Sequence, residues 1–129
     1  SLDFGHGVVV AGSASPSVVK PPFATHEAVD PEAAFVASLS ACHMLWFLDH
    51  AITRGFVVEA YEDAAEGVLA RGPEGKVMMT TVVLRPKVRF GGDRRPDAGE
   101  IDALHHAAHE DCFIANSVRT EVRVEPVES

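Results

Sequence analysis

Cysteine is nearly absent from this sequence, with Cys42 and Cys112 the only two among 129 residues. The chain has no Cys-x-x-Cys pair and no His-Glu-x-x-His segment, so the common zinc motifs are missing. It also has no glycine-rich phosphate loop and no nucleophilic serine motif. Because the chain has no visible secretion signal, its two thiols are better explained as reactive groups than as a structural disulfide.

Positive charge is also scarce, with 11 Lys and Arg against 19 Asp and Glu and a net charge of −8. No run of basic residues occurs, which argues against a nucleic-acid backbone or an anionic membrane surface as partner. The longest apolar stretch, residues 33–48, is shorter than the ~20 residues that a bilayer requires. We therefore predict a cytoplasmic protein that binds neither nucleic acid nor membrane.

The length indicates a single domain over residues 1–129, and 47% hydrophobic residues can form a core. A monomer of this size buries a modest fraction of its surface, so oligomerisation would help it. The sequence begins at Ser1 without Met, within an apparent strand. We expect N-terminal residues to be missing from the sequence as given.

A long helix is predicted from Pro31 to about Arg54. Asp30 can cap its first turn, Glu32 suits the positive end of the helix dipole, and Gly55 is a typical terminator. The helix is apolar on nearly every side, which predicts burial all round. A partner subunit is the simplest cover for it.

The remaining patterns predict strands, a second helix and a final strand. The second helix runs from Pro96 to about Cys112, and Gly67 marks a possible bulge. The strands are predicted at residues 8–11, 56–71, 77–90 and 118–124. This order indicates an α+β domain with a long central helix and a second helix against an antiparallel-rich sheet.

Both thiols fall on helices, and Cys112 shares an inward-facing stripe with Ile101, Leu104 and Ala108. Either thiol could be a small buried hydrophobe. Alternatively, one thiolate could attack an oxidant and become a sulfenic acid, which the second thiol converts to a disulfide. That chemistry requires Cα atoms within ~7 Å, which spacing alone does not establish.

Residues 30–44, which read Asp-Pro-Glu-Ala-Ala-Phe-Val-Ala-Ser-Leu-Ser-Ala-Cys-His-Met, resemble the signature of the OsmC/Ohr family of thiol peroxidases. The shared features are the Pro-Glu pair and the later Ala-Cys pair in the central helix. Residues 109–117, around Cys112, resemble the family's second-cysteine motif. The resemblance covers nearly the whole chain from Ser13 and implies an OsmC-like fold in an intertwined homodimer.

The resemblance also implies an activity and roles for three residues. Cys42 would be the peroxidatic cysteine that attacks an organic hydroperoxide, and Cys112 would resolve the resulting sulfenic acid as a disulfide. Glu32 would orient an arginine that lowers the pKa of the attacking cysteine. The reductant would be a thiol or a small dithiol such as dihydrolipoamide, with no cofactor and no metal.

Two features complicate this assignment. Glu32 and Cys42 are ten residues apart, or ~15 Å along a straight helix, so a shared site needs a helix break or a second chain. The family arginine lies on an N-terminal strand, but this chain has no arginine before Arg54 and only Lys20 as an upstream cation. We favour an arginine preceding Ser1; without one, peroxidase activity would be doubtful.

Two alternative functions remain open. His105, His109 and Cys112 have metal-ligand spacing, and His43 or Cys42 could complete a tetrahedral site in a metal-binding module. His43 itself points about 100° away from Cys42, which makes a Cys-His catalytic pair unfavourable. The second alternative is a redox-inert dimer that binds a small apolar ligand beside buried thiols.

Overall fold

The 30 residues before the long helix contain little regular structure. Strand β1 (Leu2–Asp3) pairs antiparallel with β2 (Val9–Val10), which lies within the strand predicted at residues 8–11, and an irregular connector follows. The computed structural model describes residues 1–128 and divides into two compact units, Ser1–Phe35 and Val36–Ser129. The assignment of the chain to a single domain stays a prediction.

Helix α1 (Pro31–Thr53) begins and ends as the sequence predicts. The backbone N–H of Ala33 donates to Oδ1 of Asp30 at 2.8 Å, which satisfies a donor of the first turn. Gly55 follows the helix with φ 82°, a left-handed conformation that favours glycine. The helix is continuous over 23 residues, so the predicted alternative of a break near its start is not found.

One stripe of α1 is buried within the single chain. Its members recur every four residues and are Leu39, His43, Phe47 and Ala51. On other faces the side chains of Leu45 and Ile52 are 61% and 70% exposed. The apolar surface that the sequence predicts for all sides of this helix is therefore only partly covered by its own chain.

Helix α1 is also long and apolar enough to cross a membrane, by length and composition alone. The apolar stretch at residues 33–48, on which the prediction of no membrane span rests, covers only part of this helix. Core helices of soluble proteins pass the same test, so one such helix is weak evidence for a membrane span. The absence of a membrane partner stays a prediction.

The strands form two small sheets in the second unit. One pairs β3 (Val57–Asp63) antiparallel with β6 (Pro86–Gly91), and the other has the order β4 (Glu66–Arg71), β5 (Val77–Leu84), β7 (Glu121–Val124). Strand β7 is parallel to β5, a pairing that the sequence did not predict. Each long predicted strand divides in two, and the bulge of β4 follows Val68 rather than Gly67.

Helix α2 (Ala98–Asp111) begins two residues after the predicted Pro96. Asp97 and Glu100 form a capping box, which fixes that start. A short 3-10 helix, η1 (Ala115–Ser117), follows Cys112.

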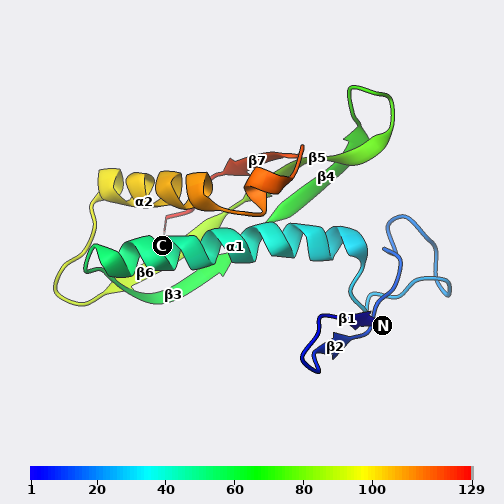
Figure 1. Cartoon of the computed structure of the whole chain (residues 1–129), viewed down its shortest axis with the longest axis horizontal. Helices are drawn as coiled ribbons and strands as arrows, with labels where there is room; N and C mark the ends of the chain where they lie inside the picture. The colour runs from blue at the N-terminus through cyan, green and yellow to red at the C-terminus, as the bar shows by residue number, and fades with distance from the viewer. Residues whose placement is uncertain (129) are drawn as a thin grey trace. The chain divides into compact units, whose positions relative to one another are not determined.

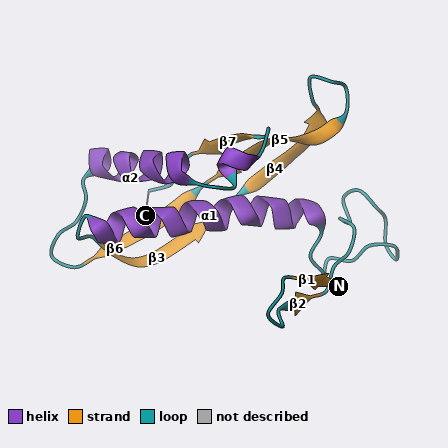
Figure 2. Ribbon diagram, viewed as in Figure 1, coloured by secondary structure: helices purple, strands orange, loops and turns teal. Residues whose placement is uncertain are grey.

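Helices α1 and α2 lie side by side over strands β3 and β6 (Figures 1 and 2). The buried core between these elements consists of Phe47, Ala51, Phe56, Val88, Leu104 and Ala108. The predicted α+β architecture is confirmed.

Candidate active site at the two thiols

The fold brings the two cysteines together although 70 positions separate them in the sequence. Cys42 lies in the middle of α1 and is partly exposed, whereas Cys112 forms the C-cap of α2 and is 1% exposed. The two side chains lie close enough together for Cys42 to raise the pKa of the Cys112 thiol. Both are free thiols. The juxtaposition on which sulfenic acid and disulfide chemistry depends is therefore present within one chain.

The surroundings of Cys112 favour its protonated form. Burial and the neighbouring Cys42 raise the pKa of Cys112 to about 11, against a smaller opposing effect of backbone N–H groups. One of these is the N–H of Ala115, which donates to Sγ of Cys112 at 3.4 Å. A thiol with this pKa is almost wholly protonated at neutral pH and is a poor first nucleophile. Cys112 is thus poorly suited to attack an oxidant directly.

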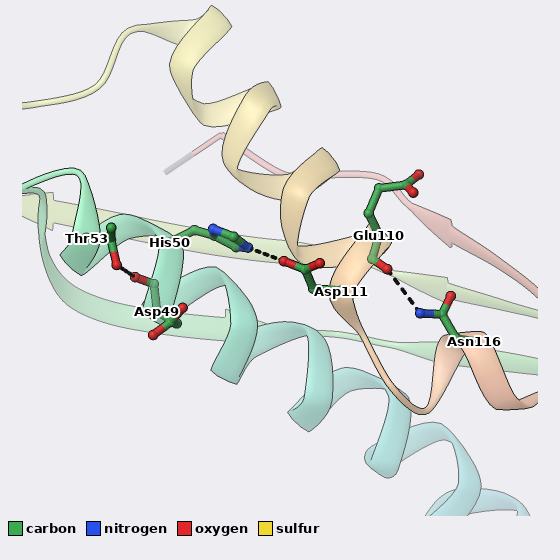
Figure 3. Close-up of polar contacts among 6 residues, drawn as sticks. All are labelled: Asp49, His50, Thr53, Glu110, Asp111 and Asn116. Carbon is green, nitrogen blue, oxygen red and sulfur yellow. Dashed lines mark hydrogen bonds and ion pairs between the residues drawn. The ribbon is translucent and has the colours of Figure 1, made fainter.

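The residues on either side of Cys112 both contact helix α1. Asp111 accepts from His50, with Oδ2 and Nε2 2.7 Å apart (Figure 3). The ring of Phe113 meets that of Trp46 edge to face, with centroids 5.4 Å apart. The segment from Asp111 to Phe113 therefore touches α1 through three consecutive side chains. The sequence did not predict the pair of His50 and Asp111. The only signal in the sequence is that His50 lies four residues after Trp46 and eight after Cys42, which places all three on one face of α1.

Local hydrogen bonds fix the shape of the turn after Cys112. The side chain of Asn116 donates to the carbonyl oxygen of Glu110 at 3.0 Å (Figure 3). The backbone N–H of Asn116 donates to the carbonyl oxygen of Cys112 at 3.0 Å, and the hydroxyl of Ser117 donates to the carbonyl oxygen of Phe113 at 2.6 Å. These hydrogen bonds satisfy carbonyl acceptors at and just beyond the end of α2, and they stabilise the turn that follows Cys112.

Two buried histidines lie close to the thiols in sequence but bond to each other. Nε2 of His43 lies 3.0 Å from Nδ1 of His105, and the rings stack with centroids 5.3 Å apart. Burial lowers the pKa of both histidines from 6.5 to about 4, and for His43 the neighbouring His105 and His109 add to the effect. Both are therefore neutral near pH 7, and one ring donates to the other.

The predicted metal site does not form in this structure. Within residues 1–128, no group of three or more His, Cys, Asp or Glu side chains is placed to hold a metal ion. His105 is directed to His43, and Cys112 to Cys42, so the proposed ligands His105, His109 and Cys112 do not converge. The helical spacing of these three residues was correct, but the fold uses them for separate contacts.

Glu32 lies in the first turn of α1, and its Oε2 atom is buried without a hydrogen-bond partner among residues 1–128. A buried carboxylate oxygen in this condition is costly unless a donor or a cation meets it. The role that the resemblance implies for Glu32, orientation of an arginine, stays a prediction.

The second unit contains a groove of about 670 Å³ between β6, α2 and the C-terminal segment. Val88, Phe90, Ile101 and His105 are among its lining residues, and neither cysteine is. This groove is therefore not the ligand site beside the thiols that the redox-inert alternative predicts. That alternative stays a prediction.

Comparison with known proteins identifies relatives of this chain. A family model described as OsmC-like protein matches residues 24–127. The chain is 51% identical to an OsmC-like protein of unknown function from Vibrio cholerae O1 biovar eltor, with a TM-score of 0.89, covering 90% of this chain and 75% of that one. No match is found among curated proteins.

Two other solved structures are less similar. An organic hydroperoxide resistance protein from Legionella pneumophila, described as a predicted redox protein, is 25% identical over 82% of this chain and 73% of that one, with a TM-score of 0.63. An organic hydroperoxide resistance protein of Bacillus subtilis is 21% identical over 79% and 71% of the two chains, with a TM-score of 0.62. The Bacillus comparison supports the fold alone.

Proposed function

Because this chain belongs to the OsmC-like protein family, we propose that it is a thiol-dependent reductase of organic hydroperoxides. The observation that carries the proposal is the proximity of Cys42 and Cys112 within one chain, which shows in the effect of Cys42 on the pKa of Cys112. Two neighbouring thiols can form a disulfide where their Cα atoms lie within ~7 Å of each other. The name of the similar Legionella protein, which refers to organic hydroperoxide resistance, supports the substrate class.

The reaction proceeds in two steps. The thiolate of Cys42 attacks the terminal oxygen of the hydroperoxide, the O–O bond breaks, and the leaving alkoxide takes a proton and departs as an alcohol. Cys42 is then a sulfenic acid. The sulfur of Cys112 attacks the sulfur of that acid, an S–S bond forms, and the hydroxyl leaves as water with the thiol proton. A small dithiol or thiol reduces the disulfide and restores both thiols.

The environments of the two thiols support this division of roles. Cys42 is partly exposed, so a hydroperoxide can reach it, whereas Cys112 is 1% exposed. The raised pKa of Cys112 keeps it protonated until Cys42 has been oxidised. A buried, protonated thiol escapes direct oxidation, and its place beside Cys42 leaves it in reach of the sulfenic acid.

We assign Glu32 to orientation of an arginine that would favour the thiolate form of Cys42. Its buried and unpartnered Oε2 supports this assignment, because a guanidinium would satisfy that oxygen. Helix α1 runs unbroken through both positions. Cooperation of Glu32 with Cys42 therefore calls for residues of two chains at one site.

The protein would act as a homodimer in the cytoplasm. The exposed apolar side chains of α1, such as Leu45 and Ile52, support a second copy as their cover. Reducing conditions in the cytoplasm suit a catalytic disulfide that must be reopened after each turnover.

Stopped-flow mixing of the reduced protein with an alkyl hydroperoxide tests the proposal. We expect the loss of two thiols per chain for each hydroperoxide consumed, and recovery of both thiols when dihydrolipoamide is added. Thiols that remain unreacted in a large excess of hydroperoxide would exclude the proposed function.

A further inference from the structure

Three side chains on one face of α1 meet three consecutive residues at the end of α2. Cys42, Trp46 and His50 recur every four residues, so they lie one above another on the helix. Cys42 contacts Cys112, Trp46 contacts Phe113, and His50 contacts Asp111. Along α1 the three contacts thus form a row, with the thiols at one end and the bond between His50 and Asp111 at the other.

We propose that His50 and Asp111 are positioning residues that hold Cys112 against Cys42 for disulfide formation. The proposal rests on the proposed function for its biological meaning, but its chemistry concerns the two thiols alone. The helix pair is joined at this point by a short bond, since Nε2 of His50 and Oδ2 of Asp111 are 2.7 Å apart (Figure 3). The imidazole is 22% exposed, so solvent only partly screens the interaction.

The position of Asp111 explains why this bond controls the thiol. Asp111 is the last residue of α2, and Cys112 is its C-cap. Few backbone torsions separate the anchored carboxylate from the thiol, so fixing one restricts the other. Figure 3 shows the Asp111 side chain directed to α1, while that of the adjacent Glu110 extends away from it. Asp111, and not its acidic neighbour, makes the connection.

Restriction of this kind raises the effective concentration of one thiol at the other. In the reduced protein the bond between His50 and Asp111 already restricts the conformational freedom of Cys112, so disulfide formation has less conformational entropy to remove. In the oxidised protein the disulfide itself supplies the restriction. A positioning pair therefore shifts the thiol–disulfide equilibrium towards the disulfide. An ion pair with a purely structural role stabilises both forms equally and leaves that equilibrium unchanged.

The second helix offers a matched control. His106 faces Glu110 within α2, with Nε2 and Oε1 4.0 Å apart and side chains 78% and 66% exposed. Replacement of His106 removes a histidine and an ion pair from the same helix without touching the connection to α1. The test compares His50→Ala with His106→Ala. It also includes His50→Gln, whose amide can still donate to Asp111.

The experiment equilibrates each full-length variant with mixtures of reduced and oxidised dithiothreitol and measures the fraction of Cys42–Cys112 disulfide. We expect the equilibrium constant for the disulfide to fall by about tenfold in His50→Ala, the scale of one charge-assisted hydrogen bond. His106→Ala should remain within about twofold of the native protein, and His50→Gln should recover most of the loss. An additional variant, Asp111→Ala, should reproduce His50→Ala if the latter folds poorly.

Equal equilibrium constants for His50→Ala, Asp111→Ala and His106→Ala would overturn the positioning role. The dithiothreitol equilibrium needs no hydroperoxide, so it separates this result from failure of the proposed function. Where the native protein does consume hydroperoxide, His50→Ala should form sulfenic acid at the native rate and convert it to disulfide about tenfold more slowly. A slowed first step with a native second step would also contradict the proposal.

Discussion

The thiol of Cys112, at the end of α2, lies close enough to Cys42 in the middle of α1 for Cys42 to raise the pKa of Cys112. The two sulfurs differ in access, since Cys42 is partly exposed and Cys112 is 1% exposed. They also differ in their structural setting. Cys42 lies within a regular helix, whereas Cys112 lies at the end of a helix, and the residues before and after it, Asp111 and Phe113, both contact α1. This asymmetry within one contact is the basis of the roles that we assign.

The first prediction separates those roles. Cys42→Ser should abolish hydroperoxide consumption, because no other thiol is accessible enough to attack. Cys112→Ser should consume one equivalent and stop at a sulfenic acid, because no partner remains to form the disulfide. Intact-mass measurement with a probe specific for sulfenic acid distinguishes the two outcomes. Repeated turnover by Cys112→Ser with native kinetics would show that Cys112 does not resolve the acid.

The second prediction concerns Glu32. Glu32→Gln keeps the shape of the side chain but removes the charge that would hold a guanidinium. We expect the second-order rate of the hydroperoxide reaction to fall by roughly 10- to 100-fold, the range for loss of a charge-assisted hydrogen bond. The disulfide equilibrium with dithiothreitol should stay within about twofold of native and serves as the internal control. An unchanged hydroperoxide rate would remove Glu32 from the site.

The third prediction follows from the buried pair of His43 and His105. Burial lowers the pKa of each in the folded protein from 6.5 to about 4, while the unfolded chain keeps the ordinary value. The unfolded state therefore binds more protons between these two pH values, and the free energy of unfolding falls as pH drops from about 6.5 to about 4. One shift of this size corresponds to roughly 3 kcal/mol.

Urea titrations at several pH values between 4 and 7.5 measure this effect. A His43→Gln/His105→Gln variant should lose much of the pH dependence, whereas His106→Ala, which alters an exposed histidine, should retain it. Parallel pH profiles for the native protein and the double variant would show that these histidines do not cause the acid sensitivity.

The fourth prediction addresses the uncovered faces of α1. Leu45 and Ile52 are 61% and 70% exposed in the single chain, which suits a surface that a second copy covers. Leu45→Glu/Ile52→Glu would place unpaired charges in that interface and should raise the dimer dissociation constant by about 100-fold or more. Sedimentation velocity over a range of concentrations measures this change. A native protein that sediments as a monomer at all concentrations contradicts the dimer.

Local signals predicted the long helix well. Asp30, Pro31 and Gly55 act at the ends of α1 through short-range capping and backbone preferences, which the sequence displays directly. The start of α2 was misplaced by two residues because the capping box of Asp97 and Glu100 outweighs the preference of Pro96 for a helix start.

Contacts between distant segments were beyond the reach of local patterns. His43 and His105 are 62 positions apart, and His50 and Asp111 are 61 apart, so no periodicity links them. Spacing along α2 suggested His105, His109 and Cys112 as ligands because helical geometry alone shows which residues share a face, not what that face meets. The resemblance to a family implied that Cys42 and Cys112 act together; the fold places them close to each other, and their catalytic roles stay a prediction.

Peptide mapping of the protein after one equivalent of alkyl hydroperoxide tests the central claim most directly. The account predicts that a peptide containing Cys42 becomes linked through a disulfide to the peptide containing Cys112 from the same chain, and that dithiothreitol releases it. Recovery of both cysteines as free thiols, or oxidation of Cys42 to a sulfinic acid with Cys112 untouched, would contradict the account.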